Sequence, residues 1–205
     1  MSRKRDYQID GPEVTAIKQC DPALIPLFDT VGNLRVVGYD DPFLCIMFFV
    51  LNQQISLKAA KTVYDRLMVH GIVTPESVLR VSDPALRALG LTTAKVTCLK
   101  SLAAATATAW FQNLALLPRS EVERHLLALP GIGPWTVAMF NLFYRFDEDV
   151  FTTTDLGLRQ ALRVVLNNPE MSHQDIQVRS IRWRPYRSVV AHYLWAFREG
   201  PNSHL

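Results

Sequence analysis

The sequence predicts an all-α fold in which helices follow one another along almost the whole chain. Apolar residues recur at intervals of three and four, the spacing that places side chains on one face of a helix. Serine, threonine or aspartate, residues that cap helix N-termini, stand directly before several of these stretches, often with a proline next in the chain. Only residues 31–39 and 149–153 indicate extended structure. We therefore expect a helical protein without a large sheet.

The first helices are expected within residues 12–70. Pro22 and Pro26 divide residues 12–30 into one or two short helices. Residues 41–52 follow an Asp-Pro start and are apolar on nearly every side, which predicts a buried helix. Residues 56–70 form an amphipathic helix, which the next glycine ends.

The middle of the chain is expected to hold two short helices and one long one. Cap motifs at Thr74-Pro75 and Ser82-Asp83 predict the short helices. The alanine-rich residues 92–110 predict the long helix, because alanine has the highest helix propensity.

The segment Leu129-Pro130-Gly131-Ile132-Gly133-Pro134-Trp135 is the most informative part of the chain. Ser120 and Glu123 match a capping box that opens a helix ending near residue 129, and apolar residues recur at helical spacing from the tryptophan to Phe146. Glycines one residue apart permit a tight hairpin and close approach by another molecule. N–H groups at a positive helix end suit a phosphate oxygen, which positions a nucleic-acid backbone without reading its sequence.

Asp155 is the candidate catalytic carboxylate. Thr154 is the expected N-cap, which places Asp155 in the first turn of a helix continuing to Val165. A helix N-terminus favours negative charge, so we expect Asp155 to stay ionised. Taken alone, the position favours an acidic residue that only complements the helix dipole. Further helices are expected at residues 172–182 and 185–198.

Four segments follow one another along the chain: Asn52–Ser56, Leu129–Trp135, Val150–Arg159, and Arg184–Ser188 with the following Tyr193-Leu194-Trp195. In this order they resemble segments of the helix-hairpin-helix DNA glycosylases. The first and last of them resemble the alkylated-base glycosylases in particular. The resemblance covers about residues 40–198 and identifies the chain as a relative of the 3-methyladenine DNA glycosylase II family. It implies two helical lobes flanking a cleft, with the N- and C-terminal helices in one lobe and the hairpin and Asp155 facing the cleft.

The resemblance also implies the chemistry. Breaking a base–sugar bond builds positive charge on the deoxyribose, which a fixed carboxylate at Asp155 can stabilise. Bifunctional relatives carry a lysine at the place of Trp135 that attacks the sugar and leads to strand cleavage. This chain has no lysine after Lys100. We therefore expect a monofunctional enzyme that leaves an intact abasic strand.

The target base must leave the helix stack, and aromatic side chains suit an electron-poor alkylated purine. The resemblance implies Trp135 and Trp195 as pocket tryptophans, although core packing explains Trp135 equally well. Trp195 lies off the apolar stripe of its helix, which favours the pocket. Gln53 matches a pocket-edge glutamine. Met139 and Leu156 stand where family members carry aromatic residues, which leaves the base preference open.

The remaining family roles concern DNA and a cation. The implied DNA-binding residues are Gln54, Gly131, Ile132, Gly133 and Pro134. Gln54 falls at the position of the wedge that fills the gap left by the flipped base, but an ordinary solvated helix end explains it equally well. The family hairpin can hold a monovalent cation through backbone carbonyls, here those near Leu127, Leu129 and Ile132. No other cofactor is expected.

Composition sets wider limits. The chain has 205 residues, 49% of them hydrophobic and 20% charged, and a net charge of +3 that only mildly favours DNA. Its three scattered cysteines, Cys20, Cys45 and Cys98, argue against a disulfide framework and against a four-cysteine iron–sulfur cluster. We expect a soluble intracellular monomer that binds duplex DNA containing alkylated bases. Residues 1–11 are expected to be a flexible tail, and residues 12–205 the glycosylase domain.

Three functions stay open at this stage. The first is an alkylated-base glycosylase. The second is a helix-hairpin-helix DNA-binding module without activity, against which Asp155 and Trp195 argue because binding alone needs neither. The third is a glycosylase for a mismatched or oxidised base, which the missing lysine and cysteine cluster disfavour.

Overall fold

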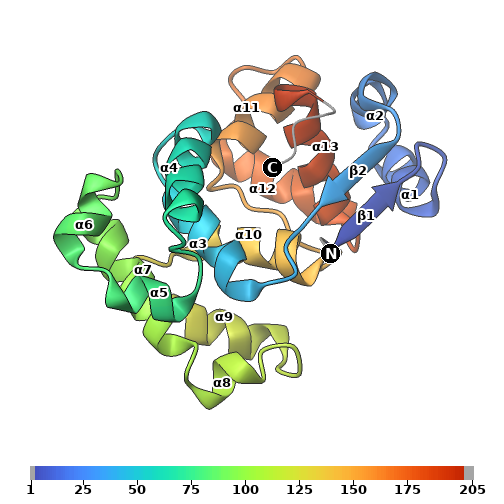
Figure 1. Ribbon diagram of the computed structural model, residues 1–205. Helices are drawn as coiled ribbons and strands as arrows, with labels where there is room; N and C mark the ends of the chain where they lie inside the picture. Colours follow the sequence, from blue (N-terminus) through green and yellow to red (C-terminus); the bar gives the residue numbers. More distant parts are fainter. Residues whose placement is uncertain (1–2, 201–205) are drawn as a thin grey trace. The chain divides into compact units, whose positions relative to one another are not determined.

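The all-α prediction is confirmed. The computed structural model describes residues 3–200, and helices account for most of this part of the chain (Figure 1). Within the described residues the only sheet has two strands. The chain divides into two compact units, which we call the central unit (Tyr39–Phe140) and the terminal unit (residues up to Gly38 and from Asn141 onward).

The central unit is built around one buried helix, α3, which packs against α4, α7 and α10 (Figure 1). Nearly every side chain from Phe43 to Leu51 is buried, as the continuous apolar run predicts. The unit's helices are α3 (Pro42–Asn52), α4 (Leu57–Val69), α5 (Pro75–Arg80), α6 (Asp83–Ala88), α7 (Thr93–Ala105), α8 (Ala109–Gln112), α9 (Arg119–Leu127) and α10 (Pro134–Phe140).

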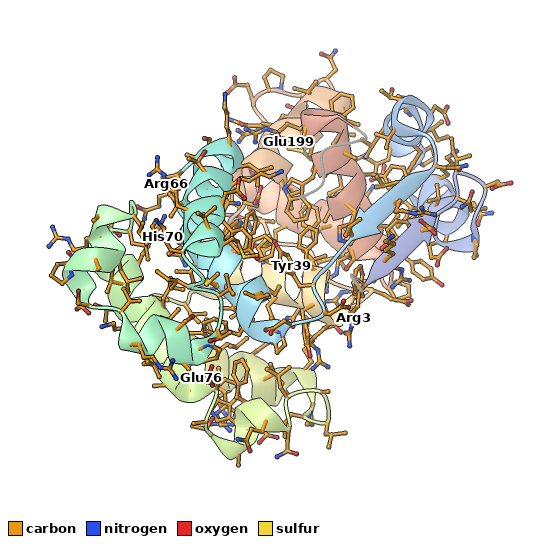
Figure 2. All side chains as sticks on the ribbon, viewed as in Figure 1. Arg3, Tyr39, Arg66, His70, Glu76 and Glu199 are labelled. Carbon is orange, nitrogen blue, oxygen red and sulfur yellow. The ribbon has the colours of Figure 1, made fainter. Side chains whose placement is uncertain are left out.

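Predicted caps fix the starts of several of these helices. Asp41 accepts a hydrogen bond from the Leu44 N–H (3.0 Å), and Thr74 forms a reciprocal capping box with Ser77. The outer helices are tied together by side chains such as Arg66 on α4, whose guanidinium donates to the Leu89 carbonyl at the end of α6 (3.4 Å; Figure 2). The two caps act within one helical turn, which explains why the sequence predicts these helix starts well.

The terminal unit combines both ends of the chain. Its elements are β1 (Lys4–Tyr7), α1 (Pro12–Cys20), η1 (Pro22–Leu24), α2 (Ile25–Val31), β2 (Leu34–Val37), η2 (Asn141–Arg145, one π-helical turn), α11 (Leu156–Val165), α12 (His173–Ser180), η3 (Ile181–Trp183) and α13 (Arg187–Glu199). Helix α13 forms the centre of the unit and packs against α11, α2 and α1. Buried Asp21 joins the unit's two sequence segments, because it accepts hydrogen bonds from Arg179 (2.8 and 2.5 Å) and from the Trp183 indole (2.8 Å).

The predicted flexible tail is wrong for residues 3–11. Strand β1 pairs antiparallel with β2, with Lys4 opposite Val37 and Tyr7 opposite Leu34. The Tyr7 side chain is only 1% exposed and its hydroxyl lies 3.2 Å from His192 Nδ1. The partners that order this segment are distant in sequence, so no local pattern reveals them. Residues 1 and 2 lie outside the described residues.

Two predicted helices have different bounds. The helix expected over residues 92–110 ends at Ala105, because the hydroxyls of Thr106 and Thr108 bond back to carbonyls three residues earlier and turn the chain before α8. The capping box at Ser120 is absent: α9 begins at Arg119 without a side-chain cap. Glu123 instead pairs with Arg119 at 2.7 Å, the i,i+4 partner on the same helix face.

Smaller differences occur near the C-terminus. The helix after the hairpin ends at Phe140 and continues as the π turn η2, and α12 ends at Ser180 before η3. Helix α13 starts two residues later than predicted, after a cis Arg184–Pro185 bond. Residues 149–153 form no strand.

Candidate functional site

The predicted hairpin is present between α9 and α10. Gly131 has φ +80°, and a Cβ there would lie 3.0 Å from the Cβ of Cys98. Backbone conformation and packing therefore both require glycine at this position. Gly133 differs: no heavy atom lies within 4 Å of the position that its Cβ would take. The hairpin is thus supported on one side by α7 and open beside Gly133.

The side chains around the hairpin differ in accessibility. Ile132 is 5% exposed and Met139 is 1% exposed, so both side chains are buried in the central unit. Ile132 can therefore offer another molecule only its backbone. Trp135 is half-buried and packs edge-on against Phe49, with ring centroids 6.0 Å apart. This contact shows that part of the Trp135 ring serves the core.

Gln53 and Gln54 follow the buried helix α3 and have different surroundings. The Gln53 Nε2 donates to the Gly131 carbonyl and to the Thr136 hydroxyl, both at 2.9 Å. The family resemblance implied Gln53 as a pocket-edge glutamine, and no pattern in the sequence indicates these bonds to the hairpin and to α10. Gln54 is exposed, with φ +61°, a left-handed conformation that is uncommon outside glycine.

Asp155 is itself the N-cap of α11, which corrects the predicted cap by one residue. Its Oδ1 accepts a hydrogen bond from the Leu158 N–H at 2.8 Å, the bond expected of the Thr154 side chain. The Thr154 hydroxyl is instead 2.7 Å from that of Thr152. The Arg159 guanidinium donates to the Thr153 carbonyl (2.6 Å). Hydrogen bonds before and after Asp155 therefore hold the loop that carries the carboxylate.

Arg198 approaches the same turn from the end of α13. A Cβ on Gly157 would overlap the Arg198 Nη1 and would lie 3.1 Å from Asp155 Oδ1. Only glycine thus leaves room for this cation beside the carboxylate. Leu156, next to Asp155, is 55% exposed.

Trp195 is largely buried, at 7% exposure, and packs against Phe143 with ring centroids 5.6 Å apart. The predicted apolar stripe that leaves out Trp195 is wrong, because α13 buries every side chain from Ser188 to Ala196. His192 lies beside it, with ring centroids 6.3 Å apart. Burial, with a smaller contribution from the charge of Arg5, lowers the pKa of His192 to about 3. Its ring is therefore neutral near pH 7.

Residues 47–188 match the model of the HhH-GPD superfamily of base excision DNA repair proteins. The chain belongs to this superfamily. The matched range contains the hairpin, both glutamines and Asp155, whereas Trp195 lies beyond it.

Relatives and solved structures agree with this membership. Over 97% of its length the chain is 30% identical to the Mycobacterium tuberculosis protein named "Probable bifunctional transcriptional activator/DNA repair enzyme AlkA", of which it spans 42%. DNA-3-methyladenine glycosidase from Bacillus halodurans has a TM-score of 0.79 at 28% identity, covering 98% of this chain and 95% of that one. Schizosaccharomyces pombe 3-methyladenine DNA glycosylase, in complex with abasic DNA, has a TM-score of 0.83 at 27% identity, covering 91% and 96%.

The candidate residues are distributed over both units of this superfamily member. Gln53, Gln54, the hairpin, Trp135 and Met139 lie in the central unit; Asp155, Leu156 and Trp195 lie in the terminal unit. Contacts within the central unit join Gln53 to the hairpin, and Asp155 lies close to Gly157 and Arg198 within the terminal unit.

The backbone carbonyls predicted to bind a cation lie at the end of α9. Helix α9 ends at Leu127, and the last carbonyls of a helix have no intrahelical partner. The Leu129 carbonyl already accepts the Ile132 N–H (3.2 Å) and retains a second lone pair. Among the described residues no group of three or more His, Cys, Asp or Glu side chains could hold a metal ion.

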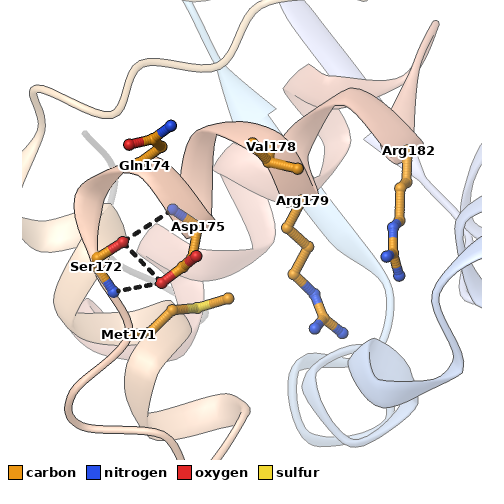
Figure 3. Close-up of a pocket in the computed structure, with 7 residues that line it drawn as sticks. All are labelled: Met171, Ser172, Gln174, Asp175, Val178, Arg179 and Arg182. Carbon is orange, nitrogen blue, oxygen red and sulfur yellow. Dashed lines mark hydrogen bonds between the residues drawn. The ribbon is translucent and has the colours of Figure 1, made fainter.

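The terminal unit contains a pocket that is lined by none of the candidate site residues. Around it Ser172 and Asp175 form the capping box that starts α12 (Figure 3). It is lined by Met171, Ser172, Gln174, Asp175, Val178, Arg179 and Arg182. The capping box and the pairing of Arg179 with Asp21 give Ser172, Asp175 and Arg179 structural roles.

In residues 3–200 no helix is long and apolar enough to cross a membrane.

Proposed function

We propose that this protein is a DNA glycosylase that excises alkylated bases, such as 3-methyladenine and 7-methylguanine, from duplex DNA. The observation that supports the proposal most is Asp155, a carboxylate fixed as the N-cap of α11 in a chain of the HhH-GPD superfamily. The names of the similar proteins from Bacillus halodurans and Schizosaccharomyces pombe support 3-methyladenine as a substrate.

In the proposed reaction the C1′–N bond breaks and its electron pair leaves with the base. An alkylated purine carries a positive charge, so it departs as a neutral molecule. The deoxyribose develops positive charge, which the Asp155 carboxylate stabilises. A water oxygen then bonds to C1′ and loses a proton, and the product is an abasic site in base excision repair.

The flipped base is proposed to contact aromatic and apolar side chains. Trp135, which is half-buried, is proposed to offer ring surface to an electron-poor purine, and Trp195, at 7% exposure, only the small part of its ring that is not packed in the core. Met139 and Leu156 stand where the family resemblance implies aromatic residues. Leu156, at 55% exposure, is proposed to contact the base, whereas the Met139 side chain is buried in the central unit at 1% exposure. A positively charged base is already a good leaving group, so a site with few specific polar contacts still discriminates against normal bases.

Water is proposed to be the only nucleophile. Trp135 occupies the position at which bifunctional relatives carry a lysine, and no lysine follows Lys100 in the sequence. We expect strands treated with the protein to stay intact until alkali is added, which a denaturing gel with and without alkali checks. Strand cleavage by β-elimination without alkali would contradict the monofunctional assignment.

DNA binding is proposed to rest on the hairpin and on Gln54. The hairpin residues Gly131, Ile132, Gly133 and Pro134 are proposed to contact a phosphate at the open side of Gly133. The N–H groups of Gly131 and Gly133 would donate to it, because the Ile132 N–H bonds to the Leu129 carbonyl and proline has no N–H. Gln54 would fill the gap left by the flipped base. We further propose a monomer, and a monovalent cation at the carbonyls of Leu127, Leu129 and Ile132, which would strengthen the hairpin's attraction for phosphate.

The test is base release from methylated duplex DNA by the wild type and by Asp155→Asn, followed by chromatography of the free bases. Asparagine caps helices as well as aspartate does, so the fold is expected to persist. The release rate is expected to fall on the order of a hundredfold or more, because the stabilising charge is lost. If the wild type binds DNA but releases no alkylated base, the protein acts on another damaged base or only binds DNA.

A further inference from the structure

Gln53 joins the loop that carries Gln54 to the hairpin within the central unit. Its side-chain amide group has two N–H donors, and both are used: one on the Gly131 carbonyl and one on the Thr136 hydroxyl. Thr136 is 2% exposed, so its hydroxyl is not available to solvent. The residue next to Gln54 is therefore bonded to the hairpin and to the first turn of α10.

Helix α7 supports both loops. The Lys95 ammonium donates to the Leu51 carbonyl near the end of α3 (2.5 Å), just before the two glutamines. One turn later, Cys98 packs against Gly131 of the hairpin. The loop with Gln54 and the hairpin thus rest on one helix, and the Gln53 amide joins them directly.

The backbone at Gln54 shows the effect of these restraints. A left-handed conformation at a residue with a side chain persists only where its surroundings enforce it. The preceding residue is held by two hydrogen bonds, and its N–H bonds to the Val50 carbonyl (3.3 Å). Gln54 is therefore presented to solvent from a fixed backbone.

We propose that Gln53 is a positioning residue that couples the Gln54 wedge to the phosphate-binding hairpin, and that its contact is with the hairpin rather than with the flipped base. The proposal rests on the proposed glycosylase function. A wedge side chain can keep a base step open only if the same unit of the protein also binds the DNA backbone nearby. Otherwise the duplex displaces the loop that carries the wedge. Loops that are held in the binding conformation before DNA binds avoid this displacement.

The donor role can be separated from simple packing. Gln53→Glu keeps the size of the side chain but has no N–H donor when ionised, and it faces the Gly131 carbonyl. Gln53→Ala removes the donor without adding charge. Thr136→Val keeps the shape and removes one acceptor. Gln112→Glu places the same charge change on an exposed residue of α8 and serves as the matched control.

Two quantities are measured for each variant. One is the single-turnover rate of base release from methylated duplex DNA at saturating protein. The other is the Kd for a fluorescent duplex with a tetrahydrofuran abasic analogue, compared with an undamaged duplex. Gln53→Glu and Gln53→Ala are each expected to lower the release rate about tenfold, the effect of losing one or two hydrogen bonds. Their affinity for undamaged DNA is expected to change less than about twofold. The release rate of Thr136→Val is expected to lie between those of the two Gln53 variants and that of the wild type.

Coupling is tested with Gln54→Ala and the Gln53→Ala/Gln54→Ala double variant. If Gln53 acts through Gln54, the double variant loses no more release rate or abasic-site preference than the stronger single variant. Multiplied effects, or wild-type behaviour of Gln53→Glu, overturn the proposal. A wild type that neither releases bases nor prefers the abasic duplex refutes the glycosylase function instead, so the two failures are distinguishable.

Discussion

Gly157 shows how a single missing side chain can shape the surroundings of the candidate carboxylate. The space that its Cβ would take is bordered by the Arg198 guanidinium and by Asp155 Oδ1. The sequence pattern predicts a helix here but does not distinguish this glycine from any other small residue.

Gly157→Ala is expected to lower the base-release rate several-fold with little change in stability. The Arg198 side chain is long and can move aside, and alanine favours the helix by roughly 0.5–1 kcal/mol over glycine. The displaced guanidinium and the crowded Asp155 carboxylate then lose their present geometry. Single-turnover kinetics and thermal unfolding measure the two effects. A wild-type rate would show that this geometry is not needed.

Gln54 offers a second test at this scale, since its backbone has a positive φ. Gln54→Gly and Gln54→Ala both remove the amide, but only glycine adopts φ +61° without strain. We expect Gln54→Gly to be more stable than Gln54→Ala by about 1 kcal/mol in urea unfolding. Equal stabilities would mean that the loop relaxes to another conformation.

Some helix starts are determined by neighbouring residues alone, and others depend on competing contacts of the capping residues. The caps at Asp41, Ser56 and Thr74 were predictable because each acts on residues within one turn. The capping box predicted for α9 does not form, because the Glu123 side chain pairs with Arg119 instead of with Ser120. At α11 two capping residues stand side by side, and the structure selects Asp155 over Thr154.

Elements of the terminal unit depend on Asp21, which connects the start of η1 with α12 and η3. Asp21→Ala is expected to lower the free energy of unfolding by about 3 kcal/mol, because Arg179 and the Trp183 indole lose a buried acceptor. The control is Asp29→Ala, whose pair with Lys18 is exposed (3.3 Å) and contributes less than about 1 kcal/mol. Equal losses in urea unfolding would contradict a structural role for the buried network.

At the scale of the whole molecule, the contacts of Tyr7 with His192 join β1 to α13, from opposite ends of the chain. His192 also packs near Phe143 and Trp195. Its Nε2 is buried with no hydrogen-bond partner among the described residues. This neutral, buried ring makes stability depend on pH.

The pKa of His192 falls from its usual value near 6.5 to about 3 on folding. Between these values the unfolded chain binds a proton that the folded protein does not, so this contribution to stability is complete above about pH 6.5 and is lost as the pH falls toward 3. Urea unfolding at pH 7.5 and 4.5 is expected to show a smaller loss for His192→Gln than for the wild type. His173→Gln, at an exposed position, is the control. An unchanged pH dependence in His192→Gln would mean that the ring is not buried as a neutral group.

The sequence by itself determined the helical class, most helix starts, the glycine hairpin and the family resemblance. Caps, apolar spacing and turn glycines act within a few residues, so their effects can be predicted locally. Only the tertiary structure decided that residues 3–11 are ordered, that Trp195 is buried and that Gln53 bonds to the hairpin 78 positions away. These outcomes depend on which distant side chains meet when the core packs. A local pattern does not contain that information.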